Sequence, residues 1–242
     1  MIEVSNLSKT FGDVTAVRDV SFKASDGQVT GLLGPNGAGK STTLRIVYGV
    51  IKPSTGAASI DGVSVTDAPL EAQRRMGILP DRVGLYSRMT AREHLRYFGR
   101  LQHLSDDQIE LRMDELIRLL DMQDIADRRA EGYSQGERMK VCLSRALLHE
   151  PRNVLLDEPT SGLDVMTTRT VRELIAELRQ RSVNVLFSSH VMHEVARLCD
   201  HIIIIAKGTV VASGTTDQIR ETAEDDNLEE AFVKLVERSY LA

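Results

Sequence analysis

Hydrophobic and polar residues alternate in pieces along the first 29 residues, for example at Ile2 and Val4. A period of two is typical of antiparallel strands that bury one face. Residues 11–13, Phe-Gly-Asp, interrupt the alternation and predict a turn. Further on, Asp61-Gly62 lies between two short apolar segments, which is a strong hairpin signal. The first quarter of the chain is therefore expected to contain a small antiparallel β layer.

Short uninterrupted apolar runs predict buried strands of a second kind. They are Gln28–Leu33, Val154–Leu156, Asn184–Phe187 and Ile202–Ala206. Runs of this kind are typical of strands covered on both faces in α/β proteins. Lys207-Gly208 then separates the last run from Thr209–Ala212 and predicts a closing hairpin.

Helical patterns fill most of the remaining chain. Thr42 to Val50 has apolar residues at helical spacing, and capping boxes begin at Thr90 and Ser105 before amphipathic stretches. We interpret these stripes as core rather than partner surface. By contrast, residues 82–89 mix Gly, Tyr, Arg and apolar residues without a period, as an exposed contact segment does. An apolar stripe in residues 228–236 predicts a docked last helix.

Composition narrows the class of protein. The chain has 242 residues and a formal net charge of −5, so it carries no basic field and no nucleic-acid partner is expected. Cys142 and Cys199 have neither metal-ligand nor Cys-x-x-Cys spacing, and we expect buried thiols in a reducing compartment. The chain start lacks a leader pattern, and the longest apolar run is too short to span a bilayer. Membrane attachment is expected only through a partner.

Residues 34–41 carry the clearest chemical signal. They read Gly, four residues, then Gly-Lys-Ser, the spacing that curls backbone N–H groups around a phosphate at a helix start. Lys40 is expected to reach the β and γ phosphates of a nucleotide, and the Ser41 hydroxyl to bind Mg²⁺. The alternative is a glycine-rich turn that binds nothing, but the strand before and the helix after the loop favour phosphate. The predicted phosphate-binding set is Gly34, Pro35, Asn36, Gly37, Ala38, Gly39, Lys40, Ser41 and Thr42.

Two acidic residues end the apolar run that starts at Val154. Asp157 is a candidate for the Mg²⁺ side, usually through water, and Glu158 could orient the attacking water. Adjacent acids can also be a solvated turn, but an apolar strand precedes these two and Pro159 follows them.

The roles of four further residues stay open on the pattern alone. Phe11 could stack on an adenine or pack into the β layer. Ser134 and Glu137 form a third capping box, which by itself indicates only a helix start. His190 directly follows a strand of a βα repeat, where open parallel sheets bind ligands, although a single histidine is commonly structural.

The order of these motifs resembles that of the ATP-binding subunits of ABC transporters over nearly the whole chain. It runs from the phosphate loop through Tyr-Ser-Gln-Gly-Glu and the strand with Asp-Glu to Ser-Gly-Leu-Asp and His190. The resemblance implies an α/β P-loop ABC ATPase fold with a RecA-like, mostly parallel core, an antiparallel β subdomain and a helical subdomain. It implies one domain over 1–242, with β layer and nucleotide-binding core at about 1–80 and 151–215. A helical lobe then covers about 88–150 and a helical tail about 216–242.

The same resemblance implies ATP and Mg²⁺ as ligands and a head-to-tail dimer of two such subunits that sandwiches two ATP molecules. Ser134, Gly136 and Glu137 would then face the phosphates held by the other subunit. Phe11 falls at the adenine-stacking position, Glu158 at the catalytic base, Asp164 in the loop that crosses the dimer and His190 at the γ-phosphate switch. Lys40 completes the catalytic set, and Ser41, Asp81 and Asp157 are the metal-side candidates.

The sequence departs from the family pattern at three places. Asp81 stands where the family usually has a glutamine between Mg²⁺ and the transporter contact, and an ionised carboxylate cannot donate a hydrogen bond. The signature has Tyr133, Gln135 and Glu137 in place of Leu, Gly and Gln. Asn153 precedes the strand at a position that is usually apolar.

We therefore expect an ATPase that drives a separate membrane permease from its cytoplasmic face. Residues 84–93 and 228–232 look most like exporter subunits, in particular those of a sodium-extruding transporter. One alternative is a soluble ABC-type ATPase switch in translation or DNA repair, but those carry two nucleotide domains or a long coiled coil. Another is a P-loop kinase for a small molecule, and the signature and Glu158 count against it.

Overall fold

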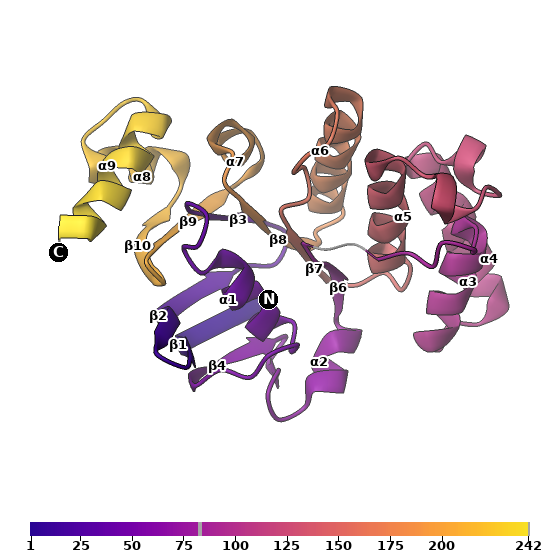
Figure 1. Ribbon diagram of the computed structural model, residues 1–242, viewed down its shortest axis with the longest axis horizontal. Helices are drawn as coiled ribbons and strands as arrows, with labels where there is room; N and C mark the ends of the chain where they lie inside the picture. Colours follow the sequence, from indigo (N-terminus) through magenta and orange to yellow (C-terminus); the bar gives the residue numbers. More distant parts are fainter. Residues whose placement is uncertain (82–83, 242) are drawn as a thin grey trace.

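The computed structural model describes residues 1–81 and 84–241, which form a four-stranded antiparallel sheet, a six-stranded mixed sheet and the helices around them (Figure 1). The strands are β1 (Ile2–Phe11), β2 (Val14–Ala24), β3 (Val29–Leu33), β4 (Thr55–Ile60), β5 (Val63–Ser64), β6 (Met76–Leu79), β7 (Asn153–Asp157), β8 (Asn184–Ser189), β9 (His201–Ala206) and β10 (Thr209–Gly214). The α-helices are α1 (Lys40–Val47), α2 (Pro69–Arg74), α3 (Ala91–Leu101), α4 (Asp106–Leu119), α5 (Gln135–Leu147), α6 (Val165–Gln180), α7 (Met192–Leu198), α8 (Thr216–Ala223) and α9 (Leu228–Leu241).

The smaller sheet has the strand order β2-β1-β4-β5 and is the predicted β layer. Its hairpins close at the two turns expected from the sequence. Gly12 has a φ of 56° between β1 and β2, and Asp61 and Gly62 have φ values of 48° and 77° between β4 and β5. Two successive positive φ angles are typical of the type I′ turn that suits a two-residue hairpin, so the Asp-Gly signal is confirmed.

The larger sheet has the order β10-β9-β3-β8-β7-β6. Neighbouring strands from β9 to β6 are parallel, and β10 adds an antiparallel edge. The carboxyl ends of β3, β6, β7 and β8 therefore meet at one edge, where ligands of open α/β sheets bind. The phosphate loop, Asp81, Asp157, Glu158 and His190 all lie at this edge, at or just beyond the ends of these strands.

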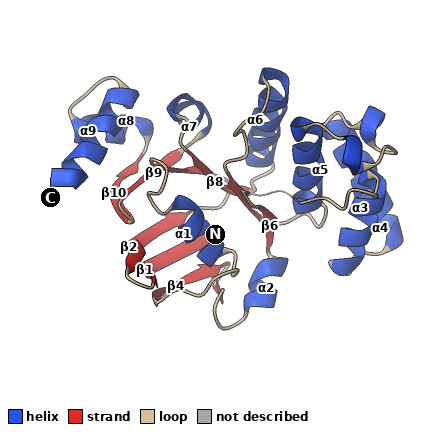
Figure 2. Cartoon of the chain, viewed as in Figure 1, coloured by secondary structure: helices blue, strands red, loops and turns tan. Residues whose placement is uncertain are grey.

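Side-chain alternation along the central strands divides the buried residues into two clusters. On β9, Ile202 and Ile204 pack toward α5, α6, α7 and the C-terminal helices, whereas Ile203 and Ile205 pack toward α1 and the β layer. Figure 2 shows the helices of the first cluster on one side of the sheet and the antiparallel sheet on the other. Burying one such side chain is worth about 1.5–3 kcal/mol, so both faces fix the sheet in place.

The capping boxes at Thr90 and Ser105 are confirmed. Each side chain accepts a hydrogen bond from the third backbone N–H of its helix, from Glu93 and Gln108 respectively. Helices α3 and α4, which fall in the predicted helical lobe, pack on α5 of the same range (Figure 1). Among the described helices, none combines the length and the hydropathy that a bilayer span requires.

Some element boundaries differ from the predictions. Helix α1 begins at Lys40 instead of Thr42 and ends at Val47, because Gly39 with a φ of 105° turns the chain directly from the loop into the helix. Helix α2 was not predicted, since it has only six residues and buries only Ala72, too few to produce a period. Strand β8 continues to Ser189, two residues beyond its apolar run.

The structure explains why a polar residue, Asn153, stands at a position that is usually apolar. The side chain is fully buried at the start of β7, and its Nδ2 donates to Asp61 Oδ2 at 2.9 Å. Its Oδ1 accepts from Asn184 Nδ2 at 3.0 Å. This polar link joins the β layer to the central sheet, a contact that an apolar residue at 153 could not make.

The thiols are both free, with Cys142 buried and Cys199 half-buried. Burial raises the pKa of Cys142 to about 11 and also raises the pKa of Cys199. The prediction of buried thiols is thus confirmed for Cys142 and holds in part for Cys199.

Candidate functional site

The loop between β3 and α1 has the backbone conformation that an anion requires. Gly37 and Gly39 have φ values of 78° and 105°, which are disfavoured for L side chains. A Cβ atom on Gly39 would lie 2.6 Å from the carbonyl oxygen of Ala16, while one on Gly37 would enter open space. The first N–H groups of α1 have no acceptor within the helix, so the loop presents free donors at the positive end of the helix dipole.

Lys40 lies folded over this loop. Its side chain is only 6% exposed, and its Nζ donates to the carbonyl oxygens of Gly34 at 2.7 Å and Pro35 at 3.3 Å. The same ammonium is 3.4 Å from Glu158 Oε1. A buried positive charge is thus held within reach of both the loop and the end of β7.

Asp157 ends β7 and is almost completely buried. Its Oδ1 accepts from the hydroxyls of Ser41 at 3.1 Å and Ser188 at 2.5 Å. Among the described residues, no donor reaches its buried Oδ2. Burial raises the pKa of Asp157, and the negative charges of Asp81 and Glu158 raise it further. A buried acceptor without a donor, beside a serine hydroxyl, fits a hard cation such as Mg²⁺.

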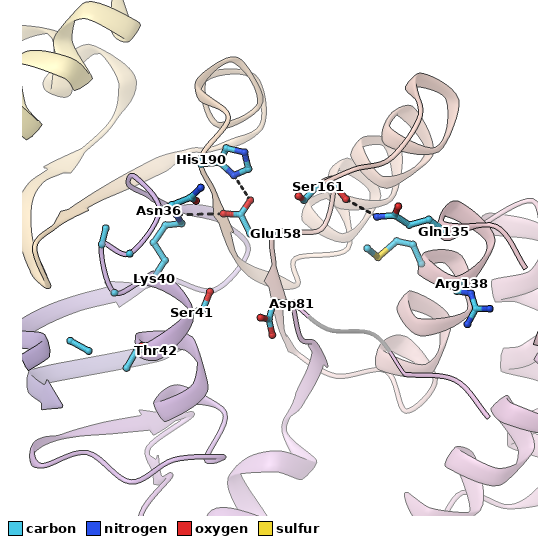
Figure 3. A pocket seen from close by; sticks show the side chains of 15 residues that line it. Asn36, Lys40, Ser41, Thr42, Asp81, Gln135, Arg138, Glu158, Ser161 and His190 are labelled. Carbon is cyan, nitrogen blue, oxygen red and sulfur yellow. Dashed lines mark hydrogen bonds and ion pairs between the residues drawn. The ribbon is translucent and has the colours of Figure 1, made fainter. Parts of the chain in front are cut away.

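Glu158 adopts an uncommon backbone conformation, with a φ of 51°. Its backbone N–H donates to Ser188 Oγ at 3.0 Å. Its carboxylate lies between two cationic or polar nitrogens, with Oε2 2.8 Å from His190 Nδ1 and Oε1 near Lys40 (Figure 3). The strand ends of β7 and β8 and the phosphate loop therefore meet at this side chain.

Asp81 follows β6 and is held by a residue that the sequence analysis did not single out. Both of its carboxylate oxygens accept from Arg45 Nη2, at 3.1 and 2.9 Å. The ion pair raises the pKa of the Arg45 guanidinium. Arg45 belongs to α1, so the residue at the expected glutamine position is tied to the helix that follows the phosphate loop.

A cavity of about 610 Å³ lies over these groups (Figure 3). It brings together predicted residues of the loop, Asp81, Glu158 and His190 with residues that were not predicted. The lining residues are Ala16, Asn36, Gly37, Ala38, Gly39, Lys40, Ser41, Thr42, Asp81, Gln135, Arg138, Met139, Glu158, Ser161 and His190. Asp157 reaches this lining through Ser41, whose hydroxyl donates a hydrogen bond to Asp157 Oδ1.

Phe11, Gly34 and Pro35 do not line the cavity. Gly34 and Pro35 serve it indirectly, as acceptors for Lys40. Phe11 ends β1 with its ring 49% exposed and Lys9 Nζ 5.0 Å from the ring centroid. The ring is thus available at the surface rather than part of the buried core.

Ser134, Gly136 and Glu137 of the signature also lie outside the cavity lining of their own chain, whereas Gln135 of the same segment lines it. The third capping box is confirmed, because Ser134 Oγ accepts from the N–H of Glu137 and Glu137 Oε2 accepts from the N–H of Ser134. Gly136 packs against α6, where a Cβ atom would lie 2.5 Å from Thr167 Oγ1. Ser134 remains exposed at the start of α5.

Ser188 is the site residue that the sequence analysis missed most clearly. It donates to Asp157 and accepts from the N–H of Glu158, so it fixes both acids. The signal was present, since Ser188 lies two residues before His190 at the same strand end. Gln135, Arg138 and Met139 could not be assigned, because only the folded chain brings α5 opposite the loop.

Residues 82 and 83 of the predicted contact segment lie outside the described residues. In the rest of the segment, the N–H of Tyr86 donates to His94 Nε2 at 2.8 Å, and the two rings are stacked with centroids 5.9 Å apart. His94 is fully buried, and its Nδ1 lies 2.8 Å from the carbonyl oxygen of Thr90. Because a carbonyl only accepts, Nδ1 carries the proton and the neutral ring accepts at Nε2.

This geometry predicts a pH dependence of stability. Burial lowers the pKa of His94, so the unfolded chain binds the proton more readily than the folded chain. The contribution of His94 should be complete above about pH 6.5 and be lost as the pH falls below that value. We expect the melting temperature of His94→Gln to fall less between pH 7.5 and 5.5 than that of the native chain.

Thermal unfolding followed by circular dichroism at the two pH values measures the effect. His103→Gln, at an exposed position, is the matched control and should keep the native difference. Equal falls for the native chain and His94→Gln would contradict the assignment.

Comparison with known proteins identifies relatives over most of the chain. The family described as ABC transporter matches residues 17–161. The chain is 42% identical over 242 residues to the ABC transporter ATP-binding protein NatA of Bacillus subtilis, covering 98% of each chain. It is 36% identical over 213 residues to the Nod factor export ATP-binding protein I of Rhizobium meliloti, covering 88% of this chain and 64% of that one.

Solved structures agree with the fold. An ATP-binding subunit of an ABC transporter superposes with a TM-score of 0.90 at 32% identity, covering 97% of this chain and 99% of the other. The dimeric structure of a bacterial ABC transporter cassette gives 0.82 at 25% identity, covering 89% and 98%. The predicted fold class is confirmed.

Proposed function

Because the chain belongs to the ABC transporter family, as an ATP-binding subunit that hydrolyses ATP to drive transport, we propose that it works as a head-to-tail dimer beneath a separate membrane permease. The observation that carries the proposal is the convergence of Lys40, Glu158 and His190 on one cavity at the carboxyl edge of the sheet. Residues 1–242 then act as one ATP-binding domain on the cytoplasmic face of the membrane.

In this proposal residues 34–42 bind the phosphates through backbone N–H groups, and Lys40 offsets the charge on the β and γ phosphates. Glu158 orients the attacking water and accepts its proton, and its position 2.8 Å from His190 supports a shared task at the γ-phosphate. The half-exposed ring of Phe11 is available to stack on the adenine. Contacts within the chain hold Lys40, Glu158 and His190 in place, and such preorganisation is the condition for electrostatic catalysis.

Ser41 and Asp157 are the residues that would hold Mg²⁺, with Asp81 at the edge of the same site. The donor-free Oδ2 of Asp157 supports this assignment. The ion would neutralise charge on the phosphates and the leaving oxygen. Asp81 differs from the other two, because Arg45 already binds both of its oxygens and competes with a cation for them.

Two substitutions separate the roles of Asp81. If Asp81 contributes to the metal side, Asp81→Asn should raise the Mg²⁺ concentration needed for half-maximal ATP binding severalfold. Arg45→Gln should leave that concentration unchanged or lower it, because a competitor for the carboxylate has been removed. The measurement is a Mg²⁺ titration of nucleotide binding with a fluorescent ATP analogue. Equal increases in both variants would mean that Asp81 acts only as the partner of Arg45.

The dimer is supported by what lies outside the cavity of the single chain. Ser134 is exposed at the positive end of α5, where a hydroxyl, backbone N–H groups and the dipole all favour an anion. Asp164 caps α6, and the two residues after it, Val165 and Met166, are 83% and 69% exposed. Exposed apolar residues beside a loop of this kind suit burial against a second copy. Gly136 and Glu137 would then approach the partner's phosphates together with Ser134.

Glu158→Gln tests the catalytic and dimer proposals together. The amide keeps the size of the side chain but cannot accept a proton, so the variant should bind ATP and hydrolyse it at least a hundredfold more slowly. ATP should then accumulate a dimer on size-exclusion chromatography. The same variant with ADP is the control and should elute as the native chain does. Unchanged turnover, or a nucleotide-loaded variant that stays monomeric, would refute the proposal.

The permease contact is supported by an aromatic surface on the described part of the contact segment and the helical lobe. Tyr86, Tyr97 and Leu101 are 55%, 44% and 56% exposed. The rings of Tyr86 and Tyr97 meet edge to face, and a hollow of about 460 Å³ lies along α3 beside them.

The direction and the cargo of transport are proposed from the relatives. The relative named for Nod factor export favours an exporter. The resemblance to a sodium-extruding transporter favours Na⁺ as cargo, and Na⁺ uptake by inverted vesicles tests this.

Leu101→Asp should weaken the association with the permease, because it places a charge in this surface. A polytopic membrane protein encoded beside this chain is the partner to co-express, and the yield of the copurified complex is the measurement. Leu111→Asp, at a leucine of α4 that is 71% exposed, is the matched control and should copurify as the native chain does. Equal copurification of both variants would place the contact elsewhere.

A further inference from the structure

A buried carboxylate lies outside the cavity, on the first turn of α7. Glu194 is 4% exposed, although burying a charge is costly unless it is paired. It does not line the cavity and was not singled out by the sequence. The groups that pair with Glu194 should explain why its buried charge is tolerated.

Glu194 has two partners on two different elements. Its Oε1 accepts from Arg172 Nη2 of α6 at 2.9 Å. Its Oε2 accepts from the hydroxyl of Thr160 at 2.5 Å. Thr160 belongs to the loop that leaves Glu158 and continues to α6, so Glu194 connects that loop with both helices.

The loop needs such a connection because of the conformation of Glu158. A φ of 51° is left-handed, and a non-glycine residue stays in this strained region only where the surrounding structure holds it there. Ser188 and His190 hold Glu158 from the end of β8. Thr160 lies two residues further along the loop, and its bond to Glu194 ties it to the segment that follows β8.

The segments that follow β7 and β8 are thus joined by a series of hydrogen bonds along their length. Ser188 bonds to Asp157 and to Glu158, His190 bonds to the Glu158 carboxylate, and Glu194 bonds to Thr160. Residues 158–160 and 188–194 therefore form one unit, with Arg172 supplying the positive charge that the buried carboxylate needs.

We propose that Glu194 is a positioning residue for ATP hydrolysis. Through Thr160 it keeps the loop in the conformation that places the Glu158 carboxylate between Lys40 and His190. It does not line the cavity, so it acts on the turnover step and not on nucleotide affinity. The inference depends on the role proposed above for Glu158.

Thr160→Val tests the proposal without leaving a charge unpaired, because Arg172 still binds Glu194. Valine keeps the branched shape but cannot donate, and we expect kcat for ATP to fall about ten- to a hundredfold while the Kd for ATP stays within twofold. Thr160→Ser restores the hydroxyl and should recover most of the turnover. Thr170→Val, which removes the hydroxyl of another α6-region threonine that bonds only to the Met166 carbonyl, is the matched control and should turn over normally.

A double-substitution cycle tests whether both residues act through one bond. Combining Thr160→Val with Glu194→Ala should reduce kcat no more than the larger single effect. Normal kcat in Thr160→Val, equal losses in the valine and serine variants, or a parallel loss of ATP affinity would overturn the proposal. Glu158→Gln is measured alongside. If that variant turns over normally, the proposed catalytic role fails. If it is inactive while Thr160→Val is normal, only this inference fails.

Discussion

The ion pair of Lys40 with Glu158, next to the buried Asp157, is the constraint on which the rest of the structure depends. One buried ammonium and two acids lie at the carboxyl edge of a parallel sheet, where the hydroxyls of Ser41 and Ser188 bond to Asp157 and His190 bonds to Glu158. Burial raises the pKa of Asp157, and repulsion from Asp81 and Glu158 raises it further, so gathering these acids here is costly. In the function that we propose, a metal ion and phosphates at this site would offset that cost.

Local patterns allowed much of this to be predicted from the sequence. The Asp61-Gly62 turn, the capping boxes and the phosphate loop each depend on residues within about seven positions of one another, so their signals are complete in the local sequence. The bond of Asn153 to Asp61, the ion pair of Arg45 with Asp81 and the bond of Thr160 to Glu194 could not be predicted. Each joins polar residues at least 34 positions apart that have no period or motif, and only the folded topology brings them together.

The signature segment shows why residue type alone does not assign a role. Ser134 caps α5, and Gly136 has room only for a hydrogen beside Thr167, so both residues have structural reasons within one chain. What points to a partner is their place outside the cavity while Gln135, one residue away, lines it. The ion pair of Asp81 with Arg45 likewise points to a partner, because it links the start of the contact segment to the helix of the phosphate loop. If the contact segment meets the permease as we propose, this ion pair would connect the nucleotide with the permease through α1.

The claim that two copies share each nucleotide is tested most directly by mixing two defective chains. Both carry Glu158→Gln to stop turnover, one also carries Lys40→Ala and the other Ser134→Arg, and trapped ATP is counted. In a mixed dimer the loop of the Ser134→Arg copy faces the intact α5 of the Lys40→Ala copy, so one site is whole. We predict that neither chain alone traps ATP and that the mixture does. A mixture that traps no more than the separate chains would contradict the account.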